Sequence, residues 1–235
     1  MIKAENLTKT YGFFTAVNSI SFEVKIGEVV GFLGPNGAGK STTMKMLTSF
    51  IAPTSGSIHI NDIDIDKNPI EAKSLIGYLP ENSPLYKDLT VIEFLKFCAN
   101  LRRIPKKNQK ASIEKVIECC GLQKVVYQTI DTLSKGYVKR TGLAQALIHD
   151  PPYLILDEPA DGLDPNQKVL VHSLIKEMSK TKAILLSTHV LEEAQEFCSR
   201  LIIISNGKIT SEGSTKELCM KHGGSLSEAF KRLTT

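Results

Sequence analysis

The residues with the clearest chemical meaning lie at positions 34–42, which read GPNGAGKST and fit the phosphate-loop pattern G-x-x-x-x-G-K-[ST]. The glycines let the backbone pass close to a polyphosphate, with successive N–H groups pointing inward. The Lys40 side chain can neutralise charge on β- and γ-phosphates, and the Ser41 hydroxyl can ligate Mg²⁺. The sequence therefore predicts a nucleotide site made of Gly34, Pro35, Asn36, Gly37, Ala38, Gly39, Lys40, Ser41 and Thr42.

Two carboxylates farther along the chain can complete such a site. Asp157 and Glu158 directly follow the apolar run 153–156 (YLIL), which is typical of a buried strand. Such a strand delivers its last residues to the carboxyl edge of a parallel sheet, where ligands of α/β folds bind. We expect Asp157 to hold Mg²⁺ through water, and Glu158 to act as the general base that prepares the attacking water.

Two further segments place polar groups at the ends of predicted elements. His189 follows the apolar run 183–188 (AILLST) and leaves the sheet at the same kind of edge, so we expect a polar contact with the γ-phosphate. The segment 133–137 (LSKGY) has a good helix N-cap at Ser134 and a glycine at position 136 that permits close approach. It predicts a second helix N-terminus suited to an anion, although read alone it indicates only a capped helix.

The elements that must position these residues follow from hydrophobic periodicity. The apolar run 28–33 (EVVGFL) predicts a strand buried on both faces, and residues 41–50 predict a helix whose positive end faces the anion. Similar runs predict strands at 74–79, 153–156, 183–187 and 201–205, and helical patterns lie at 136–150, 166–179 and 191–200. Strands that alternate with helices imply a parallel sheet, so we expect an α/β fold.

Three other regions have different patterns. Alternation at 2–7, 16–24 and 57–65 predicts strands of an antiparallel sheet, with Asn61-Asp62 suited to a hairpin turn. Helical spacing from 91 to 122 predicts helices joined by the basic loop 102–110 (RRIPKKNQK). That loop is either solvated or in contact with lipid headgroups or an acidic partner. The tail at 214–235 predicts one or two short surface helices.

Composition narrows the class of protein. The chain has 235 residues, of which 42% are hydrophobic and 23% charged, so it is an ordinary globular sequence of one large domain or two small ones. A formal charge of +4 does not argue for a nucleic-acid partner. Five cysteines without a C-x-x-C pair favour reduced cytosolic thiols over a disulfide framework or a zinc site. The sequence shows no signal peptide and no bilayer-spanning run, so a partner would supply any membrane-spanning part.

Taken together, these residues resemble the ATP-binding cassette (ABC) ATPases. The stretch 34–42 matches the Walker A loop, 155–158 matches Walker B with its catalytic glutamate, and LSKGY matches the signature usually written LSGGQ. The D-loop would be Asp161, Gly162, Leu163 and Asp164, and His189 would be the switch histidine. Tyr11 stands where an aromatic residue of the family stacks on adenine, and Val17 is assigned to the same nucleotide site. The tail looks like that of stand-alone cassettes serving bacterial export-type transporters.

The resemblance implies a fold and a mechanism. The fold would be a P-loop NTPase core with a mostly parallel sheet, an antiparallel β subdomain and an α-helical subdomain inserted at about 81–139. All of residues 1–235 would form a single cassette, with a helical tail at about 214–235. The cassette would hydrolyse ATP with Mg²⁺ as a homodimer or paired with a second cassette. Its signature would act in trans through Leu133, Ser134, Lys135, Gly136 and Tyr137.

In the resembling family, hydrolysis separates the paired cassettes, and the inserted helices pass this motion to an integral membrane permease subunit. The cassette itself would be cytoplasmic and peripheral on the inner face of the membrane. One alternative is a cassette that moves no solute, of the iron–sulfur assembly type. Another is a GTPase switch, but the N-K-x-D motif that reads guanine is absent from the sequence.

Three departures from the family pattern concern the site. Glu81 follows GYLP where the family usually has a glutamine, and Lys139 stands where a glutamine commonly precedes Arg140. Lys135 and Tyr137 replace the second glycine and the glutamine of LSGGQ. If Glu81 takes over the role of the glutamine, the Mg²⁺ ligands are Ser41, Glu81 and Asp157, since a hard cation accepts carboxylate oxygen. The alternative is that Glu81 turns outward and pairs with a lysine such as Lys87.

Overall fold

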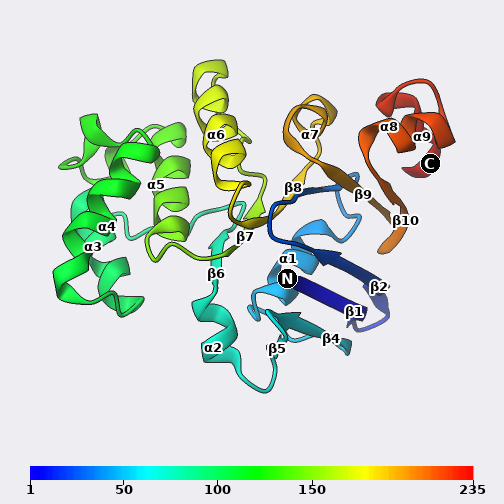
Figure 1. Cartoon of the computed structure of the whole chain (residues 1–235), viewed down its shortest axis with the longest axis horizontal. Helices are drawn as coiled ribbons and strands as arrows, with labels where there is room; N and C mark the ends of the chain where they lie inside the picture. The colour runs from blue at the N-terminus through cyan, green and yellow to red at the C-terminus, as the bar shows by residue number, and fades with distance from the viewer. Residues whose placement is uncertain (235) are drawn as a thin grey trace.

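The computed structural model describes residues 1–234 and consists of two β-sheets, with helices packed mainly against the larger one (Figure 1). The larger sheet has six strands in the order β10-β9-β3-β8-β7-β6. Its parallel strands are β3 (Val29–Leu33), β6 (Ile76–Leu79), β7 (Tyr153–Asp157), β8 (Ala183–Thr188) and β9 (Arg200–Ser205). The edge strand β10 (Lys208–Gly213) is antiparallel to β9. The predicted α/β fold with a mostly parallel sheet is therefore confirmed.

The smaller sheet is antiparallel, with the strand order β2-β1-β4-β5. Its strands are β1 (Ile2–Tyr11), β2 (Phe14–Val24), β4 (Ser55–Ile60) and β5 (Ile63–Asp64). Asn61 and Asp62 connect β4 to β5 with φ angles of 52° and 65°. Positive φ at both central residues is the geometry that two-residue hairpins favour, so the predicted hairpin turn is confirmed.

Helices connect the strands of the larger sheet and cover it. α1 (Lys40–Leu47) follows β3, and α2 (Pro69–Ser74) precedes β6. Between β6 and β7 lie α3 (Val91–Leu101), α4 (Lys106–Cys119) and α5 (Lys135–Leu147), which are grouped on one side of the molecule (Figure 1). Two 3-10 turns, Gln123–Val125 and Ile130–Thr132, lie between α4 and α5. α6 (Pro165–Met178) joins β7 to β8, and α7 (Leu191–Phe197) joins β8 to β9.

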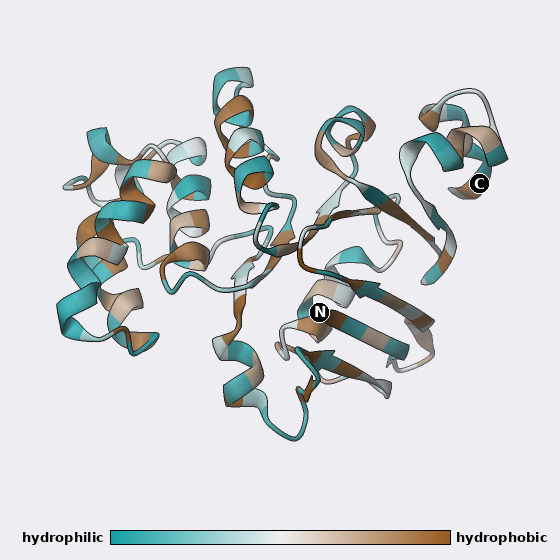
Figure 2. Cartoon of the chain, viewed as in Figure 1, coloured by the Kyte–Doolittle hydropathy of each residue, from teal (hydrophilic) through white to brown (hydrophobic). Residues whose placement is uncertain are grey.

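The larger sheet buries both of its faces. In β7, Leu154 and Leu156 belong to a core shared with α3, α4, α5 and α6, whereas Tyr153 and Ile155 belong to a core shared with α1 and the smaller sheet. Because successive side chains of a strand point to opposite faces, one apolar run serves both cores. Figure 2 shows the apolar colour along the central strands and alternating colours on the surrounding helices. None of the helices within residues 1–234 combines the length and apolar character needed to cross a bilayer.

The C-terminal segment is packed on the sheet rather than lying freely on the surface. It forms α8 (Thr215–His222) and α9 (Leu226–Thr234), beside β9 and β10 (Figure 1). Leu218 and Leu226 are buried against Leu201 and Ile203 of β9. The tail is thus a pair of short helices whose buried side chains share a core with β3, α7 and β9.

The predicted strand at 74–79 is wrong at its start. Ser74 is the last residue of α2, and β6 begins at Ile76. Pro69 occupies the first turn of α2, where its missing N–H costs no helical hydrogen bond. An apolar run of this length does not distinguish the end of a helix from the start of a buried strand. The basic loop predicted at 102–110 is shorter than expected, because α4 begins at Lys106 and includes residues 106–110. The other predicted strands and helices are present, with bounds that differ by a few residues.

Candidate active site

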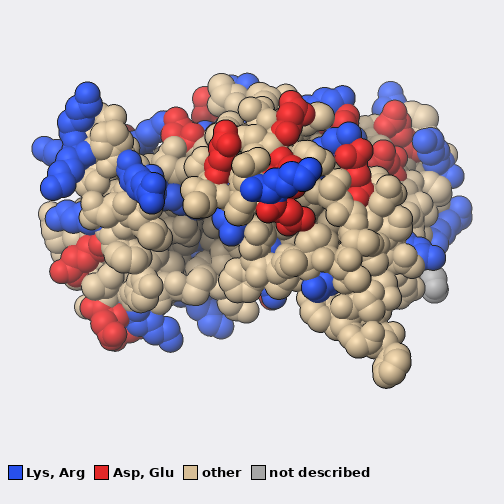
Figure 3. Space-filling view, turned by 90° about the horizontal axis from the view of Figure 1, so that it is seen from below, with Lys and Arg blue, Asp and Glu red and all other residues tan. Residues whose placement is uncertain are grey.

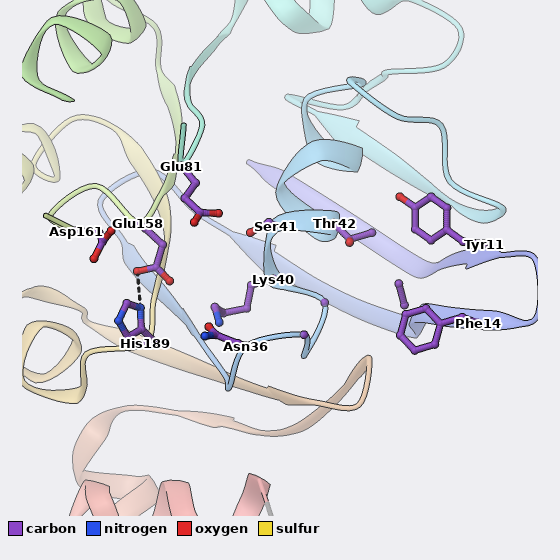
Figure 4. A pocket seen from close by; sticks show the side chains of 13 residues that line it. Tyr11, Phe14, Asn36, Lys40, Ser41, Thr42, Glu81, Glu158, Asp161 and His189 are labelled. Atoms are coloured by element: carbon purple, nitrogen blue, oxygen red, sulfur yellow. Dashed lines mark hydrogen bonds and ion pairs between the residues drawn. The ribbon is translucent and has the colours of Figure 1, made fainter. Parts of the chain in front are cut away.

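A cavity of about 540 Å³ lies at the carboxyl ends of β3, β7 and β8, beside the glycine-rich loop (Figure 4). This is the edge at which ligands of open α/β sheets bind. The residues lining it come from the loop, the strand ends and the β1–β2 hairpin: Tyr11, Phe14, Ala16, Asn36, Gly37, Gly39, Lys40, Ser41, Thr42, Glu81, Glu158, Asp161 and His189. Residues singled out along most of the sequence therefore meet at one cavity.

The glycine-rich loop can adopt its shape only because of its glycines. Gly37 and Gly39 have φ angles of 81° and 107°, in the left-handed region that other residues rarely adopt. A Cβ added to Gly39 would also lie 2.6 Å from the backbone oxygen of Ala16. α1 begins directly after the loop, so the N–H groups of its first turn, which lack helical partners, lie at the cavity. These groups form a site suited to an anion.

Lys40 lies inside the loop, with only 7% of its surface exposed. Its Nζ donates to the backbone oxygens of Gly34, at 2.6 Å, and Pro35, at 3.1 Å. Burial lowers the pKa of Lys40, while the carboxylates of Glu158, Asp157 and Glu81 oppose that change. The ammonium is thus held at the loop by neutral carbonyls, and an anionic phosphate is a stronger acceptor for it.

Asp157 is buried below the cavity at the end of β7, with 1% of its surface exposed. Its Oδ1 accepts hydrogen bonds from Ser187 Oγ at 2.5 Å and from Ser41 Oγ at 3.3 Å. Ser187 lies on β8, so these bonds fix the carboxylate to the neighbouring strand and to the first turn of α1. Sequence patterns gave no indication of this role for Ser187.

The residues around Asp157 fit a Mg²⁺ ion. Ser41, Asp157 and Glu81 offer the oxygen ligands that this cation prefers, and all three lie at or just below the cavity. No group of three His, Cys, Asp or Glu side chains within residues 1–234 could hold a metal ion by itself. Mg²⁺ commonly binds through one or two carboxylates together with phosphate oxygens and water, so this donor set is adequate once a nucleotide is present.

Glu158 has an unusual backbone conformation, with a φ angle of 50°. Its N–H donates to Ser187 Oγ at 3.0 Å and to the backbone oxygen of Ser187 at 3.3 Å, and both contacts hold this conformation. Its Oε2 lies 3.0 Å from His189 Nδ1, across the cavity from the loop (Figure 4). Other non-glycine residues of the chain have similar φ angles, so the cavity position and the contacts of Glu158, not its backbone conformation, place it at the site.

Glu81 follows β6 and extends into the cavity on the side of Ser41 (Figure 4). No ion pair joins it to Lys87 in the part of the chain that the structure describes, so the outward-facing alternative has no support. Behind it, the buried Lys139 of α5 donates from Nζ to the Glu81 backbone oxygen at 2.9 Å. Burial lowers the pKa of Lys139, whereas the carboxylates of Asp161, Asp157, Glu158 and Glu81 act in the opposite direction.

Two aromatic side chains lie at the far end of the cavity. Tyr11 and Phe14 are paired across the turn at residues 12–13, and both line the cavity, with 49% and 64% of their surfaces exposed (Figure 4). Val17 was predicted at the nucleotide site, but it is fully buried behind Gly39 and does not line the cavity. Alternation along β2 turns Val17 into the core and leaves Ala16 at the wall instead. Phe14 was not predicted, although its pairing with Tyr11 follows once the turn is placed.

We expect Phe14→Ala to weaken ATP binding about tenfold, because stacking of a base on an aromatic ring contributes roughly 1–3 kcal/mol. Binding of tripolyphosphate, which has no base, is expected to change less than about twofold. Calorimetric titrations with both ligands measure the difference. Phe13→Ala is the matched control, since Phe13 is fully exposed at the hairpin tip and does not line the cavity. Equal losses for ATP and tripolyphosphate would show that Phe14 supports the loop and does not contact the base.

The LSKGY segment does not line this cavity. Ser134 is the N-cap of α5 and accepts a hydrogen bond from the Tyr137 N–H at 3.4 Å. Ser134 and Lys135 are exposed, Leu133 and Tyr137 are half-buried, and Gly136 is buried under the Gln167 side chain of α6. The segment therefore presents a capped helix N-terminus away from the nucleotide cavity of its own chain.

The residues predicted as the D-loop connect β7 to α6. Asp161 lines the cavity and is exposed, whereas Leu163 is buried. Gly162 has a φ angle of 72° and permits the turn. Asp164 is the N-cap of α6, with its Oδ1 accepting a hydrogen bond from the Gln167 N–H at 2.9 Å. Only the first of these four residues lies at the cavity.

Similarity to known proteins agrees with this geometry. The family model described as ABC transporter matches residues 17–161. The bacitracin transport ATP-binding protein BcrA of Bacillus licheniformis is 41% identical over 216 residues, which cover 90% of this chain and 69% of that protein. The solved structure of an ATP binding subunit of an ABC transporter superposes with a TM-score of 0.92 and 29% identity over the full length of both chains. A dimeric bacterial ABC transporter cassette has a TM-score of 0.84 and 25% identity, over 91% of this chain and 98% of that one.

Proposed function

Because this chain belongs to the ABC transporter family, as an ATP-binding subunit, we propose that it hydrolyses MgATP as one half of a cassette dimer and thereby drives export through a separate membrane subunit. The observation that carries the proposal is the meeting of Lys40, Glu158 and His189 at one cavity. A phosphate-binding loop and a carboxylate placed opposite it are the two parts that nucleotide hydrolysis requires. The name of BcrA, a bacitracin transport protein, favours a transporter over an iron–sulfur assembly ATPase.

The residues of this chain have separate roles in the proposed reaction. The loop N–H groups and the Lys40 ammonium bind and orient the phosphates. Glu158 accepts the proton of the attacking water, and His189 positions the Glu158 carboxylate through the 3.0 Å contact. Ser41, Asp157 and Glu81 would hold Mg²⁺, which when bound neutralises phosphate charge. Tyr11 and Phe14 hold the base at the other end of the cavity.

The position of the LSKGY segment supports a site shared between two cassettes. Ser134 and Lys135 are exposed at the N-terminus of α5 and away from their own cavity, so in this proposal they meet the nucleotide of the opposite cassette. The residues proposed to act on the opposite cassette are Leu133, Ser134, Lys135, Gly136 and Tyr137. The dimeric state of a similar cassette is consistent with this arrangement.

The helices inserted between β6 and β7 are proposed to contact the membrane subunit. They occupy most of residues 81–139, within one cassette that spans the chain, and α3, α4 and α5 stand together on one side of it (Figure 1). Glu81 begins this region at the cavity, so a change at the nucleotide can reach the helices directly. In this proposal the cassette lies on the cytoplasmic face of the membrane, and residues 214–234 stabilise the β9 side of the core.

A site shared between two chains makes the rate of hydrolysis depend on protein concentration. We expect the rate of phosphate release per chain to rise with protein concentration below the dimer dissociation constant, because each chain needs a partner to complete its site. Phosphate release is also expected to require Mg²⁺ and to prefer ATP over GTP. A measurable rate per chain that stays constant on hundredfold dilution, in a protein that is monomeric by light scattering, would contradict the shared site. Absence of nucleotide binding would contradict the proposed function as a whole.

A further inference from the structure

Lys139 occupies an unusual environment for a lysine. Only 8% of its surface is exposed, and it lies on the fifth position of α5, the helix that begins with the LSKGY segment. Lysine is almost never buried to this extent unless its charge is paired. The contacts of its ammonium therefore indicate what the residue does.

The ammonium joins the ends of two neighbouring strands. Nζ donates to the Glu81 backbone oxygen, just beyond β6, at 2.9 Å, and lies 3.5 Å from the Asp157 backbone oxygen at the end of β7. Asp157 carries the buried carboxylate of the site, and Glu81 carries the carboxylate that extends into the cavity. One side chain of α5 thus holds the backbone of both acidic residues that face the metal position.

The packing of α5 around Lys139 makes this contact close. A Cβ added to Gly142, one turn farther along α5, would collide with the Ser83 side chain and lie 3.0 Å from Leu79 Cδ1. The helix therefore lies directly on the segment that carries Glu81. Removal of the ammonium would leave the buried Asp157 carbonyl and the partly buried Glu81 carbonyl with one fewer donor at the edge of the site.

The positive charge of Lys139 is opposed by the negative charges of several carboxylates at the site. The carboxylates of Asp161, Asp157, Glu158 and Glu81 all attract the Lys139 ammonium, Asp161 most strongly and Glu81 least. The direct contact of the ammonium with Glu81 is through the backbone oxygen, at 2.9 Å. Figure 3, which shows the molecule from below, has acidic side chains gathered mainly over the upper middle and basic side chains mostly toward the two ends. A glutamine at position 81 would not require a positive charge behind it, whereas the Glu81 carboxylate beside a polyphosphate does.

We propose that Lys139 is a positioning residue for Glu81 and Asp157, and that its charge offsets the Glu81 carboxylate so that the site accepts an anionic nucleotide. Glu81 and Lys139 form a compensating pair, in which the lysine fixes the backbone and lowers the repulsion between Glu81 and the phosphates. The pair also links the start of α5 to the metal position. This inference rests on the proposed function, because it concerns the binding of ATP.

The test is a set of ATP titrations with excess Mg²⁺ and with a chelator. The quantity compared is the ratio of the dissociation constant in chelator to that in Mg²⁺. Lys139→Gln is expected to raise this ratio about tenfold, because the Glu81 charge is unopposed when no metal is present. Glu81→Gln is expected to lower it about tenfold, and the double variant is expected to return within about threefold of the wild type.

Lys87→Gln is the matched control. Lys87 is exposed, lies in the same segment as Glu81 and loses the same unit of charge, but it does not line the cavity. Its ratio is expected to equal that of the wild type. If Lys87→Gln shifts the ratio and Lys139→Gln does not, the compensating charge is Lys87 and the proposal is wrong.

The ratio distinguishes positioning from a general structural role. A variant that is merely less well folded loses affinity equally with and without Mg²⁺, so its ratio does not change. If Lys139→Gln fails to fold, Glu81→Gln decides alone, because it leaves the buried lysine intact and its ratio must still fall. An unchanged ratio in Glu81→Gln overturns the inference. If the wild-type chain binds no ATP under either condition, the proposed function fails as well.

Discussion

Lys40→Ala is expected to weaken MgATP binding about a hundredfold, as measured by calorimetric titration. The ammonium is held in the loop by the backbone oxygens of Gly34 and Pro35, at 2.6 Å and 3.1 Å. These neutral carbonyls position it for phosphate oxygens, and hydrogen bonds to a charged group contribute about 1.5–3 kcal/mol each. Loss of such contacts at the β- and γ-phosphates therefore removes most of the binding energy that this loop supplies.

The matched control for this variant is Lys45→Ala. Lys45 is exposed in the last turn of the same helix, α1, and does not line the cavity, so the same change in charge is placed away from the phosphates. We expect wild-type affinity for this control and similar thermal unfolding of both variants. If Lys40→Ala binds MgATP as tightly as the wild type, the phosphate-loop assignment is wrong.

Local sequence patterns were sufficient to predict the parts of the site that lie within single elements. The loop at 34–42 is identified by spacing alone, and the acidic pair after β7 follows from an apolar run that ends in Asp157 and Glu158. The hairpin turn at Asn61-Asp62 is equally local, because the residue types themselves favour positive φ. In each case the signal and the structure involve the same few residues.

Contacts between distant segments could not be predicted in this way. The hydrogen bond from Lys139 to Glu81 spans 58 residues, and that from Ser187 to Asp157 spans 30. Neither depends on a spacing that can be read along the chain. The position of Val17 is also not local, since the side of β2 on which it lies is set by packing behind Gly39. The start of β6 was misplaced because an apolar run does not specify the helix that precedes it.

Glu158→Gln is expected to bind ATP with near wild-type affinity and to hydrolyse it at least about a hundredfold more slowly. Glutamine has the same shape and can keep a contact with His189, which lies 3.0 Å from Glu158 Oε2, but it cannot accept the proton of the attacking water. General acid–base groups contribute roughly 10²–10⁴ to rate, so the decrease in phosphate release is large and readily measured. An unchanged rate would show that another group acts as the base.

The same variant tests the shared site, because slow hydrolysis leaves ATP between the paired cassettes. Light scattering with saturating MgATP is expected to show a dimer of Glu158→Gln. Adding Ser134→Arg should abolish it, since bulk and charge are then placed at the exposed N-terminus of α5. Ser225→Arg is the control, because Ser225 is also exposed and its Oγ accepts from the Glu228 N–H at 3.3 Å, at the start of α9. A dimer that survives Ser134→Arg as well as it survives Ser225→Arg would place the pairing surface elsewhere, because the LSKGY segment could then not face the nucleotide of the second chain.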